Sequence, residues 1–80
     1  MNVEVRLFAT LRRYLPPGSD RTAAHLDLSD GASIADVLGK LAIPPQAVHL
    51  VLINGLYEAD RGRQLTDGCV VSIWPPVAGG

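Results

Sequence analysis

The sequence predicts a small α+β domain with a mixed sheet of four or five strands, one main helix at about residues 33–42 and an extended C-terminal tail. Three observations lead to this prediction. Apolar and polar residues alternate in two early stretches, apolar residues recur at helical spacing in the middle, and further apolar stretches of strand length follow. The chain has 80 residues, 48% of them hydrophobic, which suits one domain.

The first predicted element is a strand that begins almost at the N-terminus. Val3, Val5 and Leu7 alternate with polar residues, so their side chains are expected to point into the core. A short helical turn is expected next, with Thr10 as its cap. This turn ends at the Pro-Pro-Gly sequence at 16–18, which cannot continue a helix.

A second strand and the main helix follow. Ala24, Leu26 and Leu28 alternate with polar residues, and we expect this strand to pair with the first. Ser33 is expected to cap the helix, because Asp36 lies three residues later, as in a capping box. Four apolar residues at helical spacing form the face expected to pack on the sheet: Ile34, Val37, Leu38 and Leu41.

The apolar run at 50–53 is too short for a helix and predicts a strand. Because all four of its residues are apolar, we expect this strand to be buried on both faces and central in the sheet. The Asn-Gly pair at 54–55 predicts a tight hairpin turn. Leu56 and Tyr57 would form a short returning strand, followed by a polar loop over 58–64.

The last predicted strand covers residues 69–74, after Leu65 has returned to the core. Within this strand Val71 and Ile73 are expected to face inward and Trp74 to point to the opposite face. The order is then strand, strand, helix, strand, short strand, strand. A hairpin, one crossover helix and a return to the middle of the sheet describe a β-grasp, or ubiquitin-like, fold, which we therefore predict.

Charge and composition limit the classes of partner. Seven Lys and Arg residues against eight Asp and Glu residues give a net charge of -1, so neither nucleic acid nor an anionic membrane is expected as a partner. The N-terminus lacks the basic start and apolar run of a signal peptide, and no apolar run is long enough to span a bilayer. We therefore expect a cytoplasmic protein.

The segment after the last strand has a distinct composition. We expect a domain over residues 1–74 and a flexible tail over 75–80, because two consecutive prolines end the sheet ladder and favour an extended chain. Fully extended, this tail would span roughly 16 to 18 Å, enough to reach into a deep cleft of a partner. Gly79 and Gly80 have no side chains, so the end of the tail could pass a narrow channel and present the Gly80 carboxylate for activation.

These tail residues are the strongest candidate site. The alternative is that the two glycines are an incidental terminus of a plain interaction module. Gly80, with Gly79, is the predicted reactive end. Partner contacts are predicted for Trp74, Pro75, Pro76, Val77 and Ala78, with Leu56 and Tyr57 as weaker neighbours. For Trp74 the alternative is partial packing against the domain itself.

Other residues with chemical potential are expected to be structural. Cys69 begins a strand with no patterned base beside it and is expected to be a small core residue rather than a nucleophile. His25 and His49 have no metal-ligand spacing, so no metal site is predicted. Arg12 and Arg13 could meet an acidic partner surface or form a solvated helix face.

The sequence resembles the MoaD/ThiS family of ubiquitin-like sulfur carriers over essentially its whole length. The most specific likeness is the ending at 74–80, which reads Trp-Pro-Pro-Val-Ala-Gly-Gly. The segment Leu-Phe-Ala-Thr-Leu-Arg at 7–12 resembles a strand-to-helix junction of the molybdopterin synthase small subunit. Ile-Asn-Gly at 53–55 and Leu-Thr-Asp-Gly at 65–68 resemble two turns around the closing strands of the family.

The resemblance implies a carrier cycle with no catalytic site on the chain itself. A ubiquitin-activator-like adenylyltransferase would use ATP to adenylate Gly80, and a sulfur donor would convert the acyl-adenylate to a thiocarboxylate. The tail would then enter the large subunit of molybdopterin synthase and deliver sulfur for the molybdenum cofactor. No cofactor would be bound stably by the carrier.

Two other functions stay open at this point. Sulfur could instead go to the thiazole of thiamine or to another sulfur-containing product. Alternatively, the activated Gly80 could form isopeptide bonds with lysines of target proteins, which would make the chain a ubiquitin-like modifier.

Overall fold

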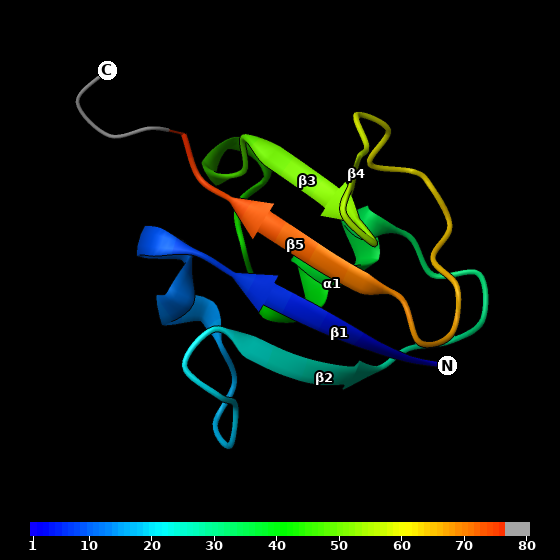
Figure 1. The fold of residues 1–80 in the computed structure, drawn as a ribbon, viewed down its shortest axis with the longest axis horizontal. Helices are drawn as coiled ribbons and strands as arrows, with labels where there is room; N and C mark the ends of the chain where they lie inside the picture. The colour runs from blue at the N-terminus through cyan, green and yellow to red at the C-terminus, as the bar shows by residue number, and fades with distance from the viewer. Residues whose placement is uncertain (77–80) are drawn as a thin grey trace.

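The structure, a computed structural model, describes residues 1–76; the tail residues Val77, Ala78, Gly79 and Gly80 lie outside the described residues. Within the described part, five strands form one mixed sheet, and α1 (Ile34–Leu41) lies against one of its faces (Figure 1). The strands are β1 (Asn2–Leu7), β2 (Ala23–Asp27), β3 (Leu50–Ile53), β4 (Leu56–Tyr57) and β5 (Val70–Trp74), and the 3₁₀ helices are η1 (Ala9–Tyr14) and η2 (Pro45–Ala47).

The strands follow the order β2-β1-β5-β3-β4 across the sheet. β1 is antiparallel to β2 and parallel to β5, whereas β3 is antiparallel to both of its neighbours, β5 and β4. The first and last strands therefore lie side by side, with β5 in the middle of the sheet (Figure 1). This arrangement confirms the predicted β-grasp fold.

The core lies between α1 and the sheet, and it contains the residues predicted for it. Val3, Val5 and Leu7 of β1 are fully buried, and so are Val71 and Ile73 of β5. Their alternation with more exposed residues follows from the two-residue period of a strand with one covered face. The predicted face of α1 is buried as well: Ile34, Val37, Leu38 and Leu41.

Local interactions fix both ends of α1. The Asp36 N–H donates to Ser33 Oγ (3.3 Å), and the Ser33 N–H donates to the Asp36 carboxylate (2.8 Å), so the predicted capping box is present. At the other end Ala42 adopts a left-handed conformation with φ of 59°, and its N–H donates to the Gly39 carbonyl (3.2 Å). The helix thus ends by an αL cap two residues before Pro44.

The prediction that residues 50–53 are buried on both faces and central is wrong. These residues do form β3, but only Val51 is buried, and the other three are half-buried. The middle strand is β5, because β3 lies one place further toward the edge. Since α1 covers a single face and the outer neighbour β4 has only two residues, an all-apolar strand is left partly open here.

The prediction that Thr10 caps the first helical turn is also wrong. η1 begins at Ala9, the N-cap position is Phe8, and no side chain caps this helix. The chain turns instead through a left-handed conformation at Ala9, with φ of 52°. Phe8 is thus the single residue between β1 and η1, and the left-handed Ala9 is the first residue of η1.

The turns around β3, β4 and the following loop agree with the sequence. The Asn-Gly pair at 54–55 has φ values of 50° and 83°, as a tight hairpin turn requires. The loop over 58–64 contains no helix or strand, and Glu58 organises its start by accepting from the Asp60 N–H (3.0 Å) and from Arg63 (2.7 Å). Chiefly because of the Asp60 N–H, and further because of Arg63, the pKa of Glu58 lies below its ordinary value.

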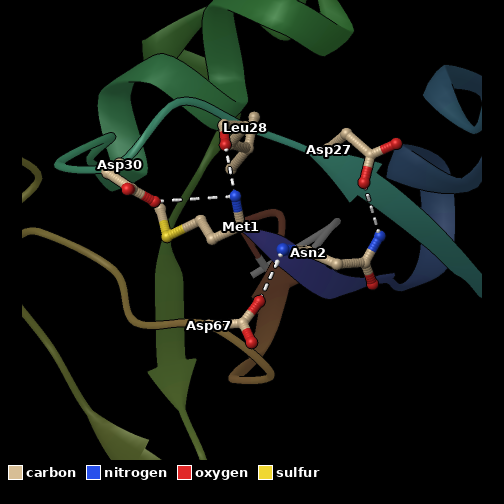
Figure 2. Close-up of polar contacts among 6 residues, drawn as sticks. All are labelled: Met1, Asn2, Asp27, Leu28, Asp30 and Asp67. Carbon is tan, nitrogen blue, oxygen red and sulfur yellow. Dashed lines mark hydrogen bonds and ion pairs between the residues drawn. The ribbon is translucent and has the colours of Figure 1, made fainter.

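The first two residues are tied to two loops at the start of the sheet (Figure 2). The Met1 amino group donates to the Leu28 carbonyl (2.8 Å) and lies 3.7 Å from an Asp30 carboxylate oxygen. The Asn2 N–H donates to the Asp67 carboxylate (2.8 Å). β1 is therefore anchored to the segments that follow β2 and precede β5.

Candidate functional site

The candidate site begins where the chain leaves the sheet. We call Trp74, Pro75 and Pro76 the tail root, because Trp74 is the last residue of β5 and the two prolines follow it. Trp74 and Pro75 are half-buried, and Pro76 is exposed. The proposed boundary between a domain over 1–74 and a tail over 75–80 stays a prediction, and the predicted reactive end lies outside the described residues.

The tail root follows the middle strand of the sheet, which is paired with a neighbour on each side. On one side β5 pairs with β1, ending with Leu7 opposite Ile73, and the Phe8 N–H donates to the Ile73 carbonyl (3.2 Å). On the other side Leu50 lies opposite Trp74, and the His49 N–H donates to the Trp74 carbonyl (2.9 Å). The point from which the tail leaves is thus held by the sheet.

Phe8 is a part of this site that sequence reasoning missed. Its ring stacks on that of Trp74, with the centroids 4.2 Å apart and the planes at 2°. The pairing of Leu7 with Ile73 in parallel strands puts the next residues, Phe8 and Trp74, side by side on the same face. Partial packing against the domain and partner contact were posed as alternatives for Trp74. The structure shows packing on Phe8 and leaves Trp74 half-buried, and its partner contact stays a prediction.

The sheet face away from α1 is the open face, and side chains line up across it. Arg6 of β1 is paired with Ser72 of β5, Ser72 with Leu52 of β3, and Leu52 with Tyr57 of β4. Tyr57 is 66% exposed at the end of this row. Because Trp74 is two residues beyond Ser72, the structure places Trp74 and Tyr57 on the same face in adjacent rows.

Leu56 does not belong to this face. It is paired with Ile53, which alternates with Leu52 and therefore points to the side of the sheet that carries α1. At the edge of the sheet it remains 74% exposed. Leu56 and Tyr57 are thus neighbours in the chain that present apolar surface in two different directions.

The last turn of η1, the helix that follows Phe8, carries two basic residues. Arg12 and Arg13 are both exposed, and the last turn of η1 carries no acidic residue. Arg12 Nε donates to the Ala9 carbonyl (3.3 Å), and the Arg13 guanidinium lies 5.1 Å from the centre of the Tyr14 ring. An acidic partner surface and solvent are both compatible with these positions.

Of the other candidate residues, Cys69 is a buried free cysteine with 2% exposure, as expected for a core residue. His25 and His49 are exposed. Among residues 1–76, no group of three or more His, Cys, Asp or Glu side chains could hold a metal ion. None of the helices described is long and apolar enough to cross a membrane.

A hollow near the start of α1 lies away from the tail root. It is lined by residues that include Asp27, Asp30, Asp36 and Lys40. Asp27 is paired with Asn2 at the beginning of β1, whereas the tail root follows the carboxyl end of β5, which runs parallel to β1. The hollow is therefore at the opposite end of the sheet and contains none of the predicted site residues.

Comparison with known proteins identifies the family. The ThiS family model matches residues 5–80, which include the whole tail root and the predicted reactive end. This chain belongs to the ThiS family. Proteins of the ThiS/MoaD type are small ubiquitin-like sulfur carriers or modifiers that are generally not enzymes themselves. A search of curated proteins found no match.

Solved structures agree with this ThiS-family assignment. The HVO 2177 protein of Haloferax volcanii is 31% identical, with a TM-score of 0.76, over 100% of this chain and 87% of that one. SAMP1, a small archaeal modifier protein of the same organism, is 26% identical, with a TM-score of 0.74, over 100% of both chains. A chain in the complex of molybdopterin-converting factor subunits 1 and 2 from Helicobacter pylori is 25% identical, with a TM-score of 0.61, over 100% of both chains.

Proposed function

We propose that this ThiS-family protein is a sulfur carrier whose Gly80 carboxylate is adenylated and then converted to a thiocarboxylate. The observation that carries the proposal is the match to the family model, which continues through Gly80. The sulfur recipient would be the molybdopterin pathway, with this chain as the small subunit of molybdopterin synthase. Support for this recipient comes from the full-length similarity to a chain of the Helicobacter pylori molybdopterin-converting factor complex.

The chemistry requires partners because a carboxylate is unreactive by itself. An α-carboxyl group has a pKa of roughly 3.3 to 3.7 and is ionised at neutral pH, so it resists nucleophiles. An adenylyltransferase joins the Gly80 carboxylate to AMP from ATP, and pyrophosphate leaves. A persulfide of the donor then attacks the carbonyl carbon, AMP leaves, and an acyl disulfide forms. A thiol attacks the donor sulfur of this disulfide, which releases the Gly80 thiocarboxylate and leaves a disulfide between that thiol and the donor.

The domain supplies recognition in this cycle and no catalytic group. Trp74, Pro75 and Pro76 would contact a partner at the mouth of its cleft, with Val77 and Ala78 inside the cleft. Tyr57, which is exposed on the same face as Trp74, would extend the contact across the open face. Leu56 would contact only a partner that also reaches round the β4 edge. ATP would bind to the activating partner, so no cofactor is assigned to the carrier.

Two functional alternatives share the same activated end. The thiazole pathway would use the same thiocarboxylate with a different recipient. A protein modifier would instead transfer the acyl group of Gly80 to an amine, and the similarity to the small archaeal modifier protein favours this alternative over a plain interaction module.

The test is mass spectrometry of the chain after incubation with the adenylyltransferase, ATP and a sulfur donor. The proposal expects replacement of one oxygen by sulfur at Gly80. Deletion of Gly80 or addition of one residue after it should abolish the product while the folded structure is unchanged. Ala35→Ser, an exposed change on α1, serves as the matched control. Normal sulfur loading of the Gly80 deletion would contradict the proposal.

Lys40 helps to separate the carrier from the modifier. It is the single lysine of the sequence, and its Nζ donates to the Asp27 carbonyl (2.8 Å). A modifier that conjugates to copies of itself would have only Lys40 and the Met1 amine as acceptors. Conjugate ladders that disappear in Lys40→Arg would demonstrate self-conjugation through Lys40, whereas ladders that persist would indicate conjugation to the Met1 amine or to other protein targets.

A further inference from the structure

Phe8 has no assigned role in the proposed function, yet its side chain contacts Trp74, the residue from which the tail leaves the sheet. The backbone bonds between β1 and β5 end with the Phe8 N–H donating to the Ile73 carbonyl. At the next residue, Ala9, the chain turns away with φ of 52°. No backbone bond from β1 is therefore left to hold Trp74 from that side.

The Phe8 ring supplies the missing contact. It stacks on the Trp74 ring with a centroid distance of 4.2 Å and nearly parallel planes. On the opposite side, the His49 N–H holds the Trp74 carbonyl. Trp74 is thus held by a backbone hydrogen bond on the β3 side and by an aromatic stack on the β1 side. Without the ring, the last residue of β5 would be held on one side only.

We propose that Phe8 is a positioning residue, which fixes Trp74 and with it the direction in which the tail root leaves the sheet. This proposal rests on the proposed carrier function. A tail that must enter a deep cleft starts from a fixed point, so less conformational freedom is lost when the activating partner binds. In this proposal the ring acts through Trp74 and takes no part in the chemistry of the carboxylate.

Two substitutions of Phe8 distinguish the effect of its aromatic plane from that of its apolar volume. Phe8→Leu keeps an apolar side chain and removes the aromatic plane, whereas Phe8→Tyr keeps the plane. Trp74 is the single tryptophan, so time-resolved fluorescence anisotropy of the free protein reports its motion directly. We expect a larger fast depolarisation in Phe8→Leu and the parent value in Phe8→Tyr. Equal anisotropy decays in Phe8→Leu and the parent would overturn the proposed restraint.

The second readout is ATP–pyrophosphate exchange by the adenylyltransferase, with the carrier as the varied substrate. Phe8→Leu should raise KM about five-fold, because the Trp74 side chain must be immobilised on binding. Its kcat should stay near the parent value, because the docked Gly80 carboxylate is unchanged. Phe8→Tyr should restore KM. A parent KM in Phe8→Leu, or a loss confined to kcat, would overturn the positioning role.

A double-variant cycle distinguishes action through Trp74 from direct contact with the partner. If Phe8 acts through Trp74, KM for the Phe8→Leu, Trp74→Leu double variant should equal that for Trp74→Leu alone. Multiplying effects would overturn the proposal and indicate a direct contact. Absence of exchange with the parent protein would overturn the carrier function and with it the role of Phe8, whereas normal exchange in Phe8→Leu would overturn only the role of Phe8.

Discussion

The two faces of the sheet are built from the same strands but are used differently. On the covered face, Val5, Val71 and Ile73 are fully buried beneath α1. On the open face, Leu52 and Trp74 on the same or neighbouring strands remain half-buried, and Tyr57 is largely exposed. One residue of alternation thus separates side chains that are fully buried in the core from side chains that remain partly exposed.

The sharpest test of this comparison pairs one substitution on each face. Ile73→Ala removes fully buried volume and should lower the free energy of unfolding by about 2 to 5 kcal/mol. Leu52→Ala, on the neighbouring strand, removes a half-buried side chain and should cost about 1 kcal/mol. Urea denaturation of both variants measures the difference. Equal losses would show that the open face contributes as much to stability as the covered face.

The next largest effect is expected on binding. The double substitution Leu56→Ser and Tyr57→Ser removes two exposed apolar side chains, so stability should change by less than about 0.5 kcal/mol. Under the proposed function, affinity for the large synthase subunit should fall about ten-fold. Calorimetric titration with that subunit gives the affinity.

The two single variants then divide this loss between the faces. Tyr57→Ser should account for most of it, because Tyr57 shares the open face with Trp74 and Leu56 does not. A larger loss from Leu56→Ser would place the partner at the β4 edge instead.

The packing of α1 on the covered face can be weakened by removing the N-terminal cap of this helix. Ser33→Ala removes the oxygen that accepts the Asp36 N–H and should lower stability by about 1 kcal/mol. Ser29→Ala, an exposed change in the preceding turn, is the matched control. Thermal unfolding followed by circular dichroism should show a lower midpoint for Ser33→Ala alone, and similar midpoints in the two variants would argue against the capping box.

The smallest effect is expected at the helix end, with a gain in stability. Ala42 adopts φ of 59°, a conformation that favours glycine, so Ala42→Gly should stabilise the domain by about 0.5 to 1 kcal/mol. The same change within α1, Ala35→Gly, should destabilise it by about 1 kcal/mol. Opposite signs in the two variants, measured by denaturation, are the expected outcome. A loss at both positions would contradict the αL cap.

Periodicity in the sequence predicted the covered face correctly and the open face only in part. The residues of β1 and α1 that face the core were predicted correctly, because burial on one side leaves a clear two-residue or helical pattern. The all-apolar run 50–53 carries no such alternation, so its open side could not be distinguished from a buried one. The αL cap at Ala42 was not predictable, because alanine does not signal a left-handed residue.

For the candidate site too, one feature could be predicted from the sequence and another could not. Trp74 was assigned to the open face from its phase in the last strand, and the register confirms that assignment. Its stacking on Phe8 depends on β1 and β5 being parallel neighbours, which is a property of the whole sheet and of no local pattern. A prediction of strand register, added to the β-grasp topology, would have paired the two rings.

The parallel pairing of β1 and β5 also determines how the domain would respond to force. The chain enters β1 at one end of the sheet and leaves β5 at the other (Figure 1). Tension between Met1 and the tail root would therefore act along both strands and load their hydrogen bonds in shear, all at once. A domain pulled by its tail would resist unfolding better than one in which the hydrogen bonds of the end strand could break one after another.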